Sequence, residues 1–294
     1  MIVSASYRTD IPAFYAPWLL RRLEAGSCRV ANPYGGAAYE VSLAPEAVDG
    51  FVLWTRNMRP LMPDLDRLRR IAPFVVQFTV TGYPRALEHS VIAVEEAVAQ
   101  LRELRRRFGQ RAAVWRYDPI VFTGELDAGA HVAGFAALAR ALQGTVDEVV
   151  LSVMHPYRKT RRNLDRAATR HGFAWRDPPI DEKRQLVGEL AALAREHGIA
   201  PTLCSQPELL GPGPAPELGE ARCIDAERLA DVGQRPIAAR IAGNRPGCRC
   251  ARSRDIGAYE TCPHGCVYCY AVGNRDRAVA HYRNHDPDAA MLRP

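Results

Sequence analysis

The stretch FVVQFTVTGYPRALEHSVIAVEEAVAQLRELRRRFGQRAAVWRY, residues 74–117, decides the fold class. It opens with a β-rich run at 74–81, passes into a helical pattern at 91–108, and closes with a second β-rich run at 112–117. Gly109 supplies a stop signal after a turn rich in arginine. A strand, a helix and a strand at this spacing predict a right-handed βαβ crossover, and therefore a parallel sheet.

The same alternation extends in both directions along the chain. The other β-rich runs lie at 2–6, 51–55, 148–153 and 199–204, and the other clear helical patterns lie at 131–142 and 181–197. About six such units favour an α/β fold built as a TIM-like or partial (β/α) barrel over a doubly wound open sheet. Residues 27–43, with Gly35-Gly36 in the middle, predict an inserted hairpin.

The composition changes after residue 206. Residues 207–218 read PELLGPGPAPEL, which is typical of a loop or linker, and a short helical stretch follows near 225–232. The remainder has too little apolar periodicity to build its own core, so a metal centre is its expected organiser. We expect a barrel over 1–206, a linker with a short helix over 207–247, and a cysteine-rich cluster-binding segment over 248–294 packed on the barrel.

The bulk numbers place the chain among ordinary globular proteins, with 47% hydrophobic and 24% charged residues. The first residues read as a short strand and not as a signal peptide, and no apolar run approaches the length of a membrane span. We therefore expect a cytoplasmic protein that does not contact a membrane.

Basic residues cluster at 67–70, 102–107 and 158–162, but the net charge is only +6. Solvated helix faces explain such runs, and a phosphate-rich partner is the alternative. Nucleic acid is accordingly an unlikely partner.

Polar side chains follow several of the predicted strands, where barrel enzymes place their functional groups. Arg8 and Asp10 follow the first strand, Gln77 and Thr79 share one face of the third, and Arg116 and Asp118 share one face of the fourth. Together they predict a polar cavity at one barrel mouth that binds substrate or cofactor. The alternative is that single members fill the barrel or cap helices, as Asp10 could do before Ile11-Pro12.

The strongest motif is Cys262-Pro-His-Gly-Cys266-Val-Tyr-Cys269. Three thiolates within eight residues converge on one centre only if the backbone turns tightly, and Pro263 and Gly265 are turn residues. A mononuclear zinc site usually takes four ligands in two separated pairs. The motif therefore favours a [4Fe-4S] cluster that leaves one iron open to an exogenous group.

The C-x3-C-x2-C spacing, with Tyr268 just before the last cysteine, resembles the signature of radical S-adenosylmethionine enzymes. The resemblance implies that the cofactor's methionine moiety chelates the open iron and that cleavage of its sulfonium gives a 5′-deoxyadenosyl radical. It places Tyr268 beside the adenine and implies a six-unit partial barrel and an electron donor such as a ferredoxin or flavodoxin. Tyr270-Ala271 resembles the ending of the spore-photoproduct-lyase-like branch. In the superfamily the motif usually follows the first barrel strand; here it follows six, so a permuted or extended fold and a purely local match are the two alternatives.

A second resemblance spans nearly the whole chain. Four runs look like a bacterial family recorded as a domain of unknown function: IVSASYRTDIP at 2–12, WRYDPI at 115–120, KTRRN at 159–163, and DIGAY at 255–259 leading into CPHGCVYCYA. The resemblance brings no reaction with it.

Four further cysteines form a second potential ligand set: Cys204, Cys223, Cys248 and Cys250. They are enough for a second, fully ligated cluster, which leaves Cys28 over as a buried apolar thiol. The alternatives are a single cluster that takes its fourth ligand from Cys248 or Cys250, and structural zinc at the second set.

The sequence as a whole predicts an iron–sulfur protein with one or two [4Fe-4S] clusters. A radical S-adenosylmethionine-type enzyme with an unidentified small-molecule or macromolecular substrate is the first hypothesis. A non-catalytic electron-transfer or sensing protein with saturated clusters and a zinc-stabilised nucleic-acid-binding protein are the two alternatives.

Overall fold

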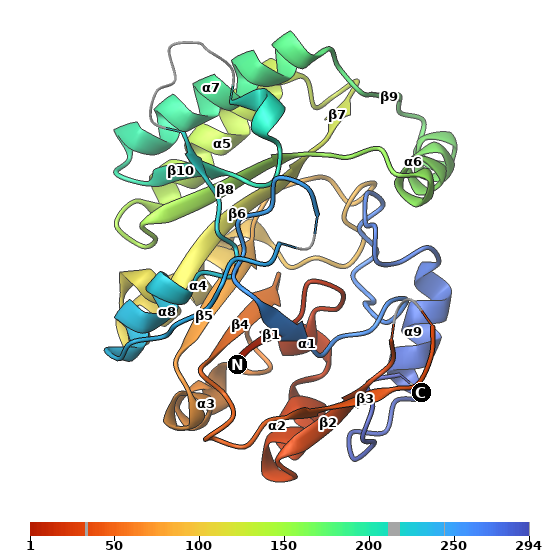
Figure 1. Ribbon diagram of the computed structural model, residues 1–294. Helices are drawn as coiled ribbons and strands as arrows, with labels where there is room; N and C mark the ends of the chain where they lie inside the picture. Colours follow the sequence, from red (N-terminus) through yellow and green to blue (C-terminus); the bar gives the residue numbers. More distant parts are fainter. Residues whose placement is uncertain (33–34, 211–217, 244, 294) are drawn as a thin grey trace.

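The computed structural model describes residues 1–32, 35–210, 218–243 and 245–293. Its centre is an all-parallel sheet of eight strands in the order β11-β10-β8-β6-β5-β4-β1-β12 (Figure 1). The strands are β1 (Ile2–Ala5), β4 (Gly50–Thr55), β5 (Phe74–Thr79), β6 (Ala113–Ile120), β8 (Glu148–Val153), β10 (Ala200–Leu203), β11 (Gly219–Glu220) and β12 (Ser253–Asp255).

The strands from β1 to β11 follow one another across the sheet in chain order. This one-way winding is what a series of right-handed βαβ units produces, and the predicted α/β class with a parallel sheet is confirmed. The six strands expected from the sequence all form. Strand β12 departs from the order, because it returns to pair with the free side of β1. Among the described residues β11 and β12 each pair with one neighbour, so this sheet has two edges.

Helices connect the strands and cover the sheet (Figure 1). They are α1 (Ile11–Phe14), α2 (Ala16–Glu24), α3 (Leu65–Ile71), α4 (Val94–Phe108), α5 (Ala128–Leu142), α6 (Arg158–His171), α7 (Ile180–Glu196), α8 (Ala226–Gly233) and α9 (Arg275–Arg283), with short 3-10 turns at Met62–Asp64, Gln110–Ala112 and Pro207–Leu209. The predicted helical patterns at 91–108, 131–142, 181–197 and 225–232 correspond to α4, α5, α7 and α8.

Each strand divides its side chains between two apolar clusters, since successive residues point to opposite faces. Phe51, Leu53 and Val76 belong to the larger cluster beneath the connecting helices. Val52 and Val75 belong to a smaller cluster on the other face, where helix α8 contributes Leu229. The smaller cluster also contains Cys204, Cys223 and Cys250, so the second cysteine set is built onto this face of the sheet.

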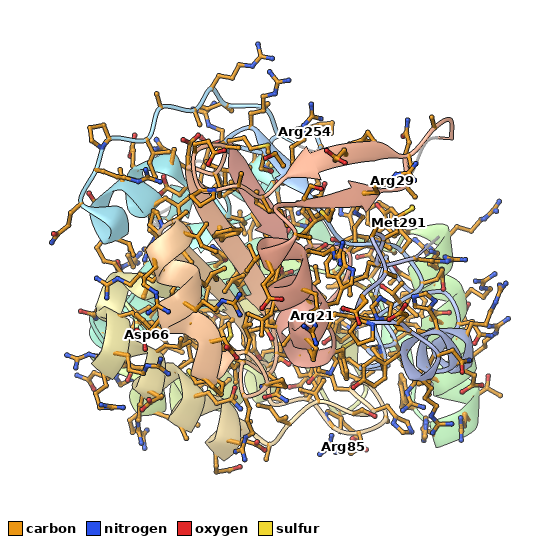
Figure 2. All side chains as sticks on the ribbon, turned by 90° about the horizontal axis from the view of Figure 1, so that it is seen from below. Arg21, Arg29, Asp66, Arg85, Arg254 and Met291 are labelled. Carbon is orange, nitrogen blue, oxygen red and sulfur yellow. The ribbon has the colours of Figure 1, made fainter. Side chains whose placement is uncertain are left out.

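An antiparallel hairpin of β2 (Ser27–Val30) and β3 (Tyr39–Ser42) lies within the segment 27–43. The chain's end packs beside it: the Arg29 amide donates to the Ala290 carbonyl at 2.8 Å, and Figure 2 shows Arg29 and Met291 together at this edge. The C-terminal segment is therefore tied to the N-terminal part of the fold. A second, short antiparallel pair joins β7 (Phe122–Thr123) to β9 (Trp175–Arg176).

Several elements of the structure lie outside the predicted strands and helices, among them β12, α6 and α9. Strand β12 reads Ser-Arg-Asp and has no apolar pattern, and α6 and α9 are dominated by charged residues. The proline-rich part of the expected linker, residues 211–217, lies outside the described residues. None of the described helices is both long and apolar enough to cross a membrane.

Candidate iron–sulfur site

A cavity of about 590 Å³ lies at the carboxyl edge of the parallel sheet. Its walls come from the residues at or after the ends of the successive strands: Ser6 to Asp10, Trp54 to Arg56, Thr79, Arg116 to Pro119, Ser152 to His155, and Cys204 to Ser205. The rest comes from the C-terminal third of the chain. Parallel strands bring their carboxyl ends to one edge, which is why loops far apart in sequence meet here.

Seven of the eight cysteines line this one cavity. The eighth, Cys28, is fully buried in the hairpin's apolar core. None of the eight forms a disulfide. The two cysteine sets recognised in the sequence, the three of the motif and the four others, are thus assembled around the same space.

The motif cysteines Cys262, Cys266 and Cys269 lie in a tight loop. The Cys269 amide donates to the Cys266 carbonyl at 3.1 Å, and Cys269 Sγ accepts from the Ala271 amide at 3.3 Å. Gly265 has a φ of +76°, and a Cβ there would lie 2.5 Å from Arg275 Cδ. Only glycine allows both this backbone conformation and this close approach, so the sequence Gly-Cys is needed to turn the second thiol inward.

The motif loop is fixed to the start of the chain. His264 Nε2 lies 2.7 Å from Asp10 Oδ2, and the Tyr15 hydroxyl donates to the Thr261 carbonyl at 2.8 Å. On the other side the Val267 amide donates to the Leu87 carbonyl at 3.0 Å. The loop therefore has protein contacts on both flanks before any cofactor is considered.

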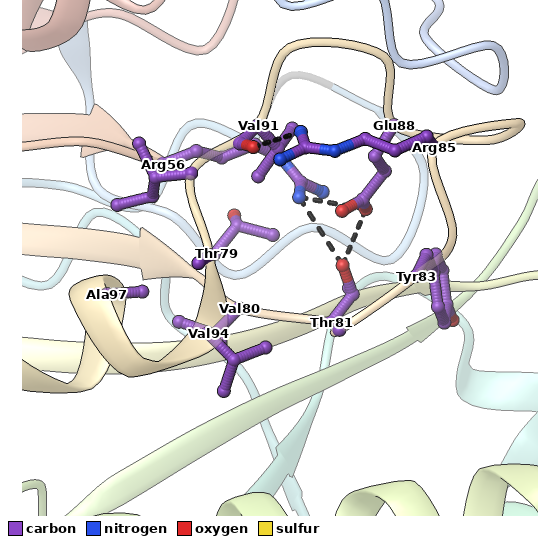
Figure 3. Close-up of a pocket in the computed structure, with 13 residues that line it drawn as sticks. Arg56, Thr79, Val80, Thr81, Tyr83, Arg85, Glu88, Val91, Val94 and Ala97 are labelled. Carbon is purple, nitrogen blue, oxygen red and sulfur yellow. Dashed lines mark hydrogen bonds and ion pairs between the residues drawn. The ribbon is translucent and has the colours of Figure 1, made fainter.

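Tyr268 belongs to a buried charged network and not to an open surface. Its hydroxyl accepts from Arg56 Nη2 at 2.6 Å and donates to Glu88 Oε1, to which Arg56 Nη1 is paired at 2.8 Å. Thr81 joins the same carboxylate, and Figure 3 shows the network beside a second cavity of about 130 Å³. Because the hydroxyl is held, the ring has one fixed orientation at the wall of the larger cavity.

The second set forms a chain of sulfurs. Cys223 Sγ lies 3.6 Å from Cys204 Sγ, and its thiol also interacts with Cys250, which in turn interacts with Cys248. The Ile224 amide donates to Cys250 Sγ at 3.4 Å. The four thiols come from the turn after β10, the segment after β11 and the segment before β12.

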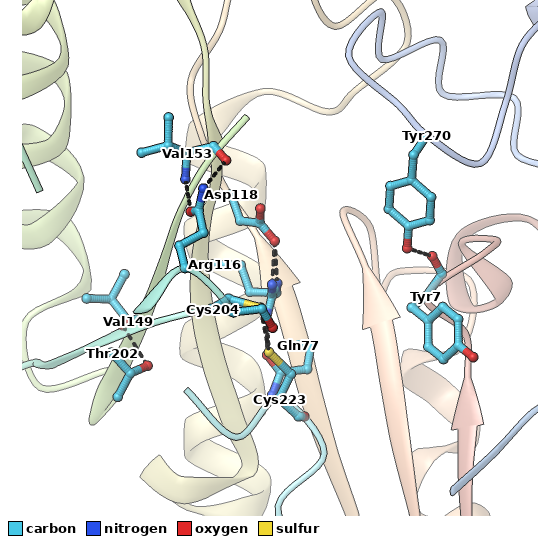
Figure 4. A network of polar contacts seen from close by, with 12 residues as sticks. Tyr7, Gln77, Arg116, Asp118, Val149, Val153, Thr202, Cys204, Cys223 and Tyr270 are labelled. Carbon is cyan, nitrogen blue, oxygen red and sulfur yellow. Dashed lines mark hydrogen bonds and ion pairs between the residues drawn. The ribbon is translucent and has the colours of Figure 1, made fainter. Parts of the chain in front are cut away.

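Two guanidinium groups point at sulfurs of the second set. Arg116 Nη1 donates to Cys223 Sγ at 3.0 Å, and Arg245 Nη2 donates to Cys204 Sγ at 3.3 Å. Figure 4 shows Arg116 between Asp118 and Cys223, with Tyr7 and Tyr270 on the facing wall of the cavity. These donors bring positive charge to the sulfurs, as thiolates require.

Burial raises the pKa of the three motif thiols, that of Cys266 to about 12. The contact with Cys223, together with burial, raises the pKa of Cys204 well above its ordinary value. A bound metal centre would supply further positive charge and favour the thiolate form of these crowded thiols.

The cysteine side chains around the cavity can be compared with the ligands that a single metal ion needs and with those that an iron–sulfur cluster needs. In the described part of the chain, no three His, Cys, Asp or Glu side chains are grouped so as to hold one metal ion. A [4Fe-4S] cubane is usually held by cysteine thiolates, one on each iron that the protein binds. The all-thiol sets present are compatible with such a cluster.

Most of the polar residues expected to bind substrate or cofactor contact other protein groups. Arg8 Nε pairs with Asp255 at 2.8 Å with both side chains buried, and Arg116 pairs with Asp118. Gln77 does not line the cavity; its side chain donates to the Cys223 carbonyl at 2.9 Å and accepts from Arg116, and its expected contact with a cofactor stays a prediction. Gln77 and Thr79 lie on the same face of strand β5, as predicted, but of the two only Thr79 lines the cavity.

The carboxylate of Asp10 is fully engaged. It caps helix α1 through the Ala13 amide at 3.0 Å and accepts from the Thr55 hydroxyl at 2.7 Å, the Arg56 amide at 2.8 Å and His264. The alternative that Asp10 caps the next helix is confirmed. Asp10 positions the motif loop, and it has no lone pair directed at a ligand.

Three important groups were missed in the sequence. Asp255 accepts from Ser4, Ser6, Arg8 and two backbone amides, and so ties β12 to β1. Next to it, a Cβ on Gly257 would lie 1.9 Å from Ser6 Oγ, which makes glycine necessary at this approach. No sequence pattern pointed to Glu88 or Arg245, because the residues that they contact lie far away in the sequence. Asp255 is the first residue of the DIGAY run, and an acidic residue at that position was the feature of the sequence that could have pointed to it.

The chain matches the family model described as a domain of unknown function, DUF1848, over residues 2–271. The chain belongs to the DUF1848 family. The whole-chain resemblance seen in the sequence is thereby confirmed. The matched span of this DUF1848 protein includes all seven cysteines that line the cavity. No curated protein and no solved structure matches the chain.

Proposed function

We propose that this DUF1848 protein is an iron–sulfur enzyme of the radical S-adenosylmethionine type. Cys262, Cys266 and Cys269 hold a [4Fe-4S] cluster with one iron open to the cavity, where the cofactor and the substrate bind. The observation that carries the proposal is that three thiols, and no fourth from the same loop, line a cavity of about 590 Å³ at the carboxyl edge of a parallel sheet.

Strand β12 supplies a second line of support. It lies at the edge of the sheet, parallel to β1, and the chain passes from it into the motif within a few residues. In the superfamily the motif follows the first strand of a six-unit partial barrel. Here β12 is first across the sheet although it is the last described strand in the sequence, and β1, β4, β5, β6 and β8 follow it as the next five, with β10 and β11 beyond them. The order supports a permuted partial barrel.

The large cavity favours an enzyme over a protein that only transfers electrons. A saturated electron-transfer centre needs a conducting contact with its partner and no room for a small molecule. The cavity presents both aromatic surface, from Trp54, Tyr259 and Tyr270, and a partly exposed carboxylate, Asp118. A pocket with apolar walls and a few polar groups is the usual form of a site for an organic ligand.

A cluster held by Cys262, Cys266 and Cys269 would supply one electron for the reductive cleavage of S-adenosylmethionine, once an external donor has reduced it. The protein itself holds the ligand in the cavity and excludes water from it. Tyr268 offers a flat face whose orientation Arg56 and Glu88 fix. Asp10 holds the motif loop through His264, and Asp118 and Thr79 are left to orient the ligand.

The test is anaerobic purification followed by iron and sulfide analysis and EPR with and without S-adenosylmethionine. We expect the cofactor to perturb the spectrum of the reduced cluster, and we expect dithionite to yield 5′-deoxyadenosine and methionine slowly without substrate. Cys262→Ala/Cys266→Ala/Cys269→Ala should abolish both responses. Cys28→Ala is the matched control, since it removes a thiol that lies outside the cavity.

Suppose that the iron-loaded protein gives an EPR spectrum that does not change with S-adenosylmethionine, and that no 5′-deoxyadenosine forms. That outcome would indicate an electron-transfer or sensing protein with saturated clusters. Zinc without sulfide in anaerobic protein would remove the iron–sulfur basis altogether.

A further inference from the structure

The second cysteine set has the properties of a ligand site in its own right. Cys204, Cys223 and Cys250 are buried in the smaller apolar cluster on the face of the sheet that carries Val52 and Val75. The motif loop packs instead on the larger cluster, to which Tyr268 and Cys266 belong. The two sets therefore occupy different walls of the cavity, each with its own apolar support.

The contacts also separate the sets. Cys250 interacts with Cys223 and Cys248, and Cys223 interacts with Cys204. Cys262 has Cys266 and Cys269 as its neighbouring thiols. The sulfurs of Cys248 and Cys250 thus join Cys204 and Cys223, and these contacts favour a second centre over the alternative in which one of them closes the motif cluster.

The surroundings of this set suit charged sulfur. A thiol is a weak hydrogen-bond acceptor, whereas a thiolate or a cluster sulfur is a strong one. Two guanidinium donors, Arg116 at 3.0 Å and Arg245 at 3.3 Å, point at two of the sulfurs. Gln77 supports Arg116 and holds the Cys223 backbone from behind. Three side chains are therefore committed to placing donors on sulfur.

We propose that Cys204, Cys223, Cys248 and Cys250 bind a second [4Fe-4S] cluster in which every iron has a cysteine ligand. Four thiolates complete the shell, so this centre stores or relays an electron and offers no open iron. Cubane is preferred to zinc because two single cysteines plus a Cys-x-Cys pair do not have the paired spacing of structural zinc sites.

The proposal gives Arg116 and Arg245 a role other than substrate binding. Each is a positioning residue that donates to a cluster sulfur. Hydrogen bonds to the sulfurs stabilise the more negative, reduced cluster and so raise its reduction potential. Loss of one donor should make the centre harder to reduce without removing its iron.

The experiment compares metal and sulfide content in four forms of the full-length protein reconstituted anaerobically. We expect about eight irons in the wild type, about four in Cys262→Ala/Cys266→Ala/Cys269→Ala, about four in Cys248→Ser/Cys250→Ser, and about eight in the control Cys28→Ala. The iron kept by the triple variant should be low-potential cubane iron by Mössbauer and EPR spectroscopy. The proposal is overturned if the triple variant keeps no iron, or if it keeps one zinc without sulfide.

These outcomes distinguish the second centre from the proposed function. Iron that survives in the triple variant supports the second cluster whether or not S-adenosylmethionine is cleaved. A response to S-adenosylmethionine that survives in Cys248→Ser/Cys250→Ser supports the first centre whether or not a second exists.

A milder variant guards against misfolding of the cysteine mutants. In the triple-alanine background, Arg245→Gln should keep about four irons but lower the potential of the remaining cluster, whereas Arg240→Gln, a change at an exposed arginine, should not. Equal potentials in the two variants would contradict the proposed contact between Arg245 and the cluster.

Discussion

The two cysteine sets differ in how the chain brings their thiols together. The motif set lies within eight residues, and local turns at Pro263 and Gly265 bring its sulfurs into one loop. The second set spans residues 204–250 and is assembled by the sheet, which brings the turn after β10 beside the segment that leads to β12. A local motif can be read from spacing alone, whereas an assembled site is visible only once the fold is known.

The difference has a consequence for stability. The motif loop depends on a few anchors to the N-terminal part of the chain, of which Asp255 and Asp10 are the main ones. The second set depends on the packing of the sheet itself. Substitutions at the anchors should therefore affect the motif centre more than the second one.

The largest effect is expected from Asp255→Ala. The change leaves Arg8 buried without its partner and cuts the link between β1 and β12. Removal of one member of a buried ion pair costs about 3–5 kcal/mol, so the free energy of unfolding should fall by about that amount. Urea denaturation measures it. Asp288→Ala is the control, since that carboxylate is 71% exposed and should change stability little. A fully stable Asp255→Ala protein would show that β12 is not the anchor of the motif loop.

A smaller effect is expected from Tyr268→Phe. The change keeps the ring but removes a hydroxyl that joins Arg56 to Glu88. Hydrogen bonds to charged groups contribute about 1.5–3 kcal/mol, and we expect a loss of stability in that range. Tyr270→Phe is the matched control, because its hydroxyl bonds a backbone carbonyl at a side chain that is 45% exposed. Equal losses in the two variants would indicate that the Tyr268 network adds nothing beyond an ordinary surface contact.

Gly265→Ala tests the local turn of the motif. A residue with a Cβ in the left-handed region costs about 1–2 kcal/mol, and here the new methyl group also meets Arg275. Stability should fall by about that amount, and iron at the motif should be lost before iron at the second set. In contrast, Gly134→Ala lies in helix α5 with open space around it, and should stabilise the protein by about 0.5–1 kcal/mol. Thermal unfolding followed with iron release separates the two.

The sequence predicted the strands well because each carries a buried apolar run bounded by turn residues. Strand β12 has no such run: Ser253–Asp255 is held by pairing with β1 and by the side chain of Asp255. Helices α6 and α9 were missed for a related reason, since few apolar residues mark their buried faces.

The candidate site shows the same limit. Cysteine spacing identified thiols that line the cavity, and strand ends identified much of the cavity wall. The partners of Arg8, Arg116 and Asp10 could not be predicted from the sequence. Which groups pair with them depends on which loops the fold places side by side. All four side chains expected to bind a ligand contact protein groups: Arg8 pairs with Asp255, Arg116 pairs with Asp118, and Asp10 accepts from the Arg56 amide.

The smallest expected effect is on the rate at which an electron donor reduces the protein. It would show on which side of the molecule, and so nearer to which of the two proposed centres, electrons enter. Helix α6 contacts the motif loop, where the Thr160 hydroxyl donates to the Tyr268 carbonyl at 3.4 Å, and its outer face carries exposed Arg162, Arg166 and Arg170. An acidic carrier such as a ferredoxin or flavodoxin should be steered to this face, so reduction should slow as salt is added.

Arg162→Glu/Arg166→Glu should therefore slow reduction by such a carrier by about tenfold at low ionic strength and flatten its salt dependence, while reduction by dithionite stays unchanged. Arg69→Glu/Arg70→Glu places the same charge change on helix α3 and should leave the rate near that of the wild type. Stopped-flow absorbance of the iron–sulfur bands measures both. If the α3 variant slows reduction as much as the α6 variant, net charge and not the position of α6 governs the encounter. If only the α6 variant is slow, electrons enter on the side of the motif loop, and the second centre receives them through the cavity wall or serves another partner.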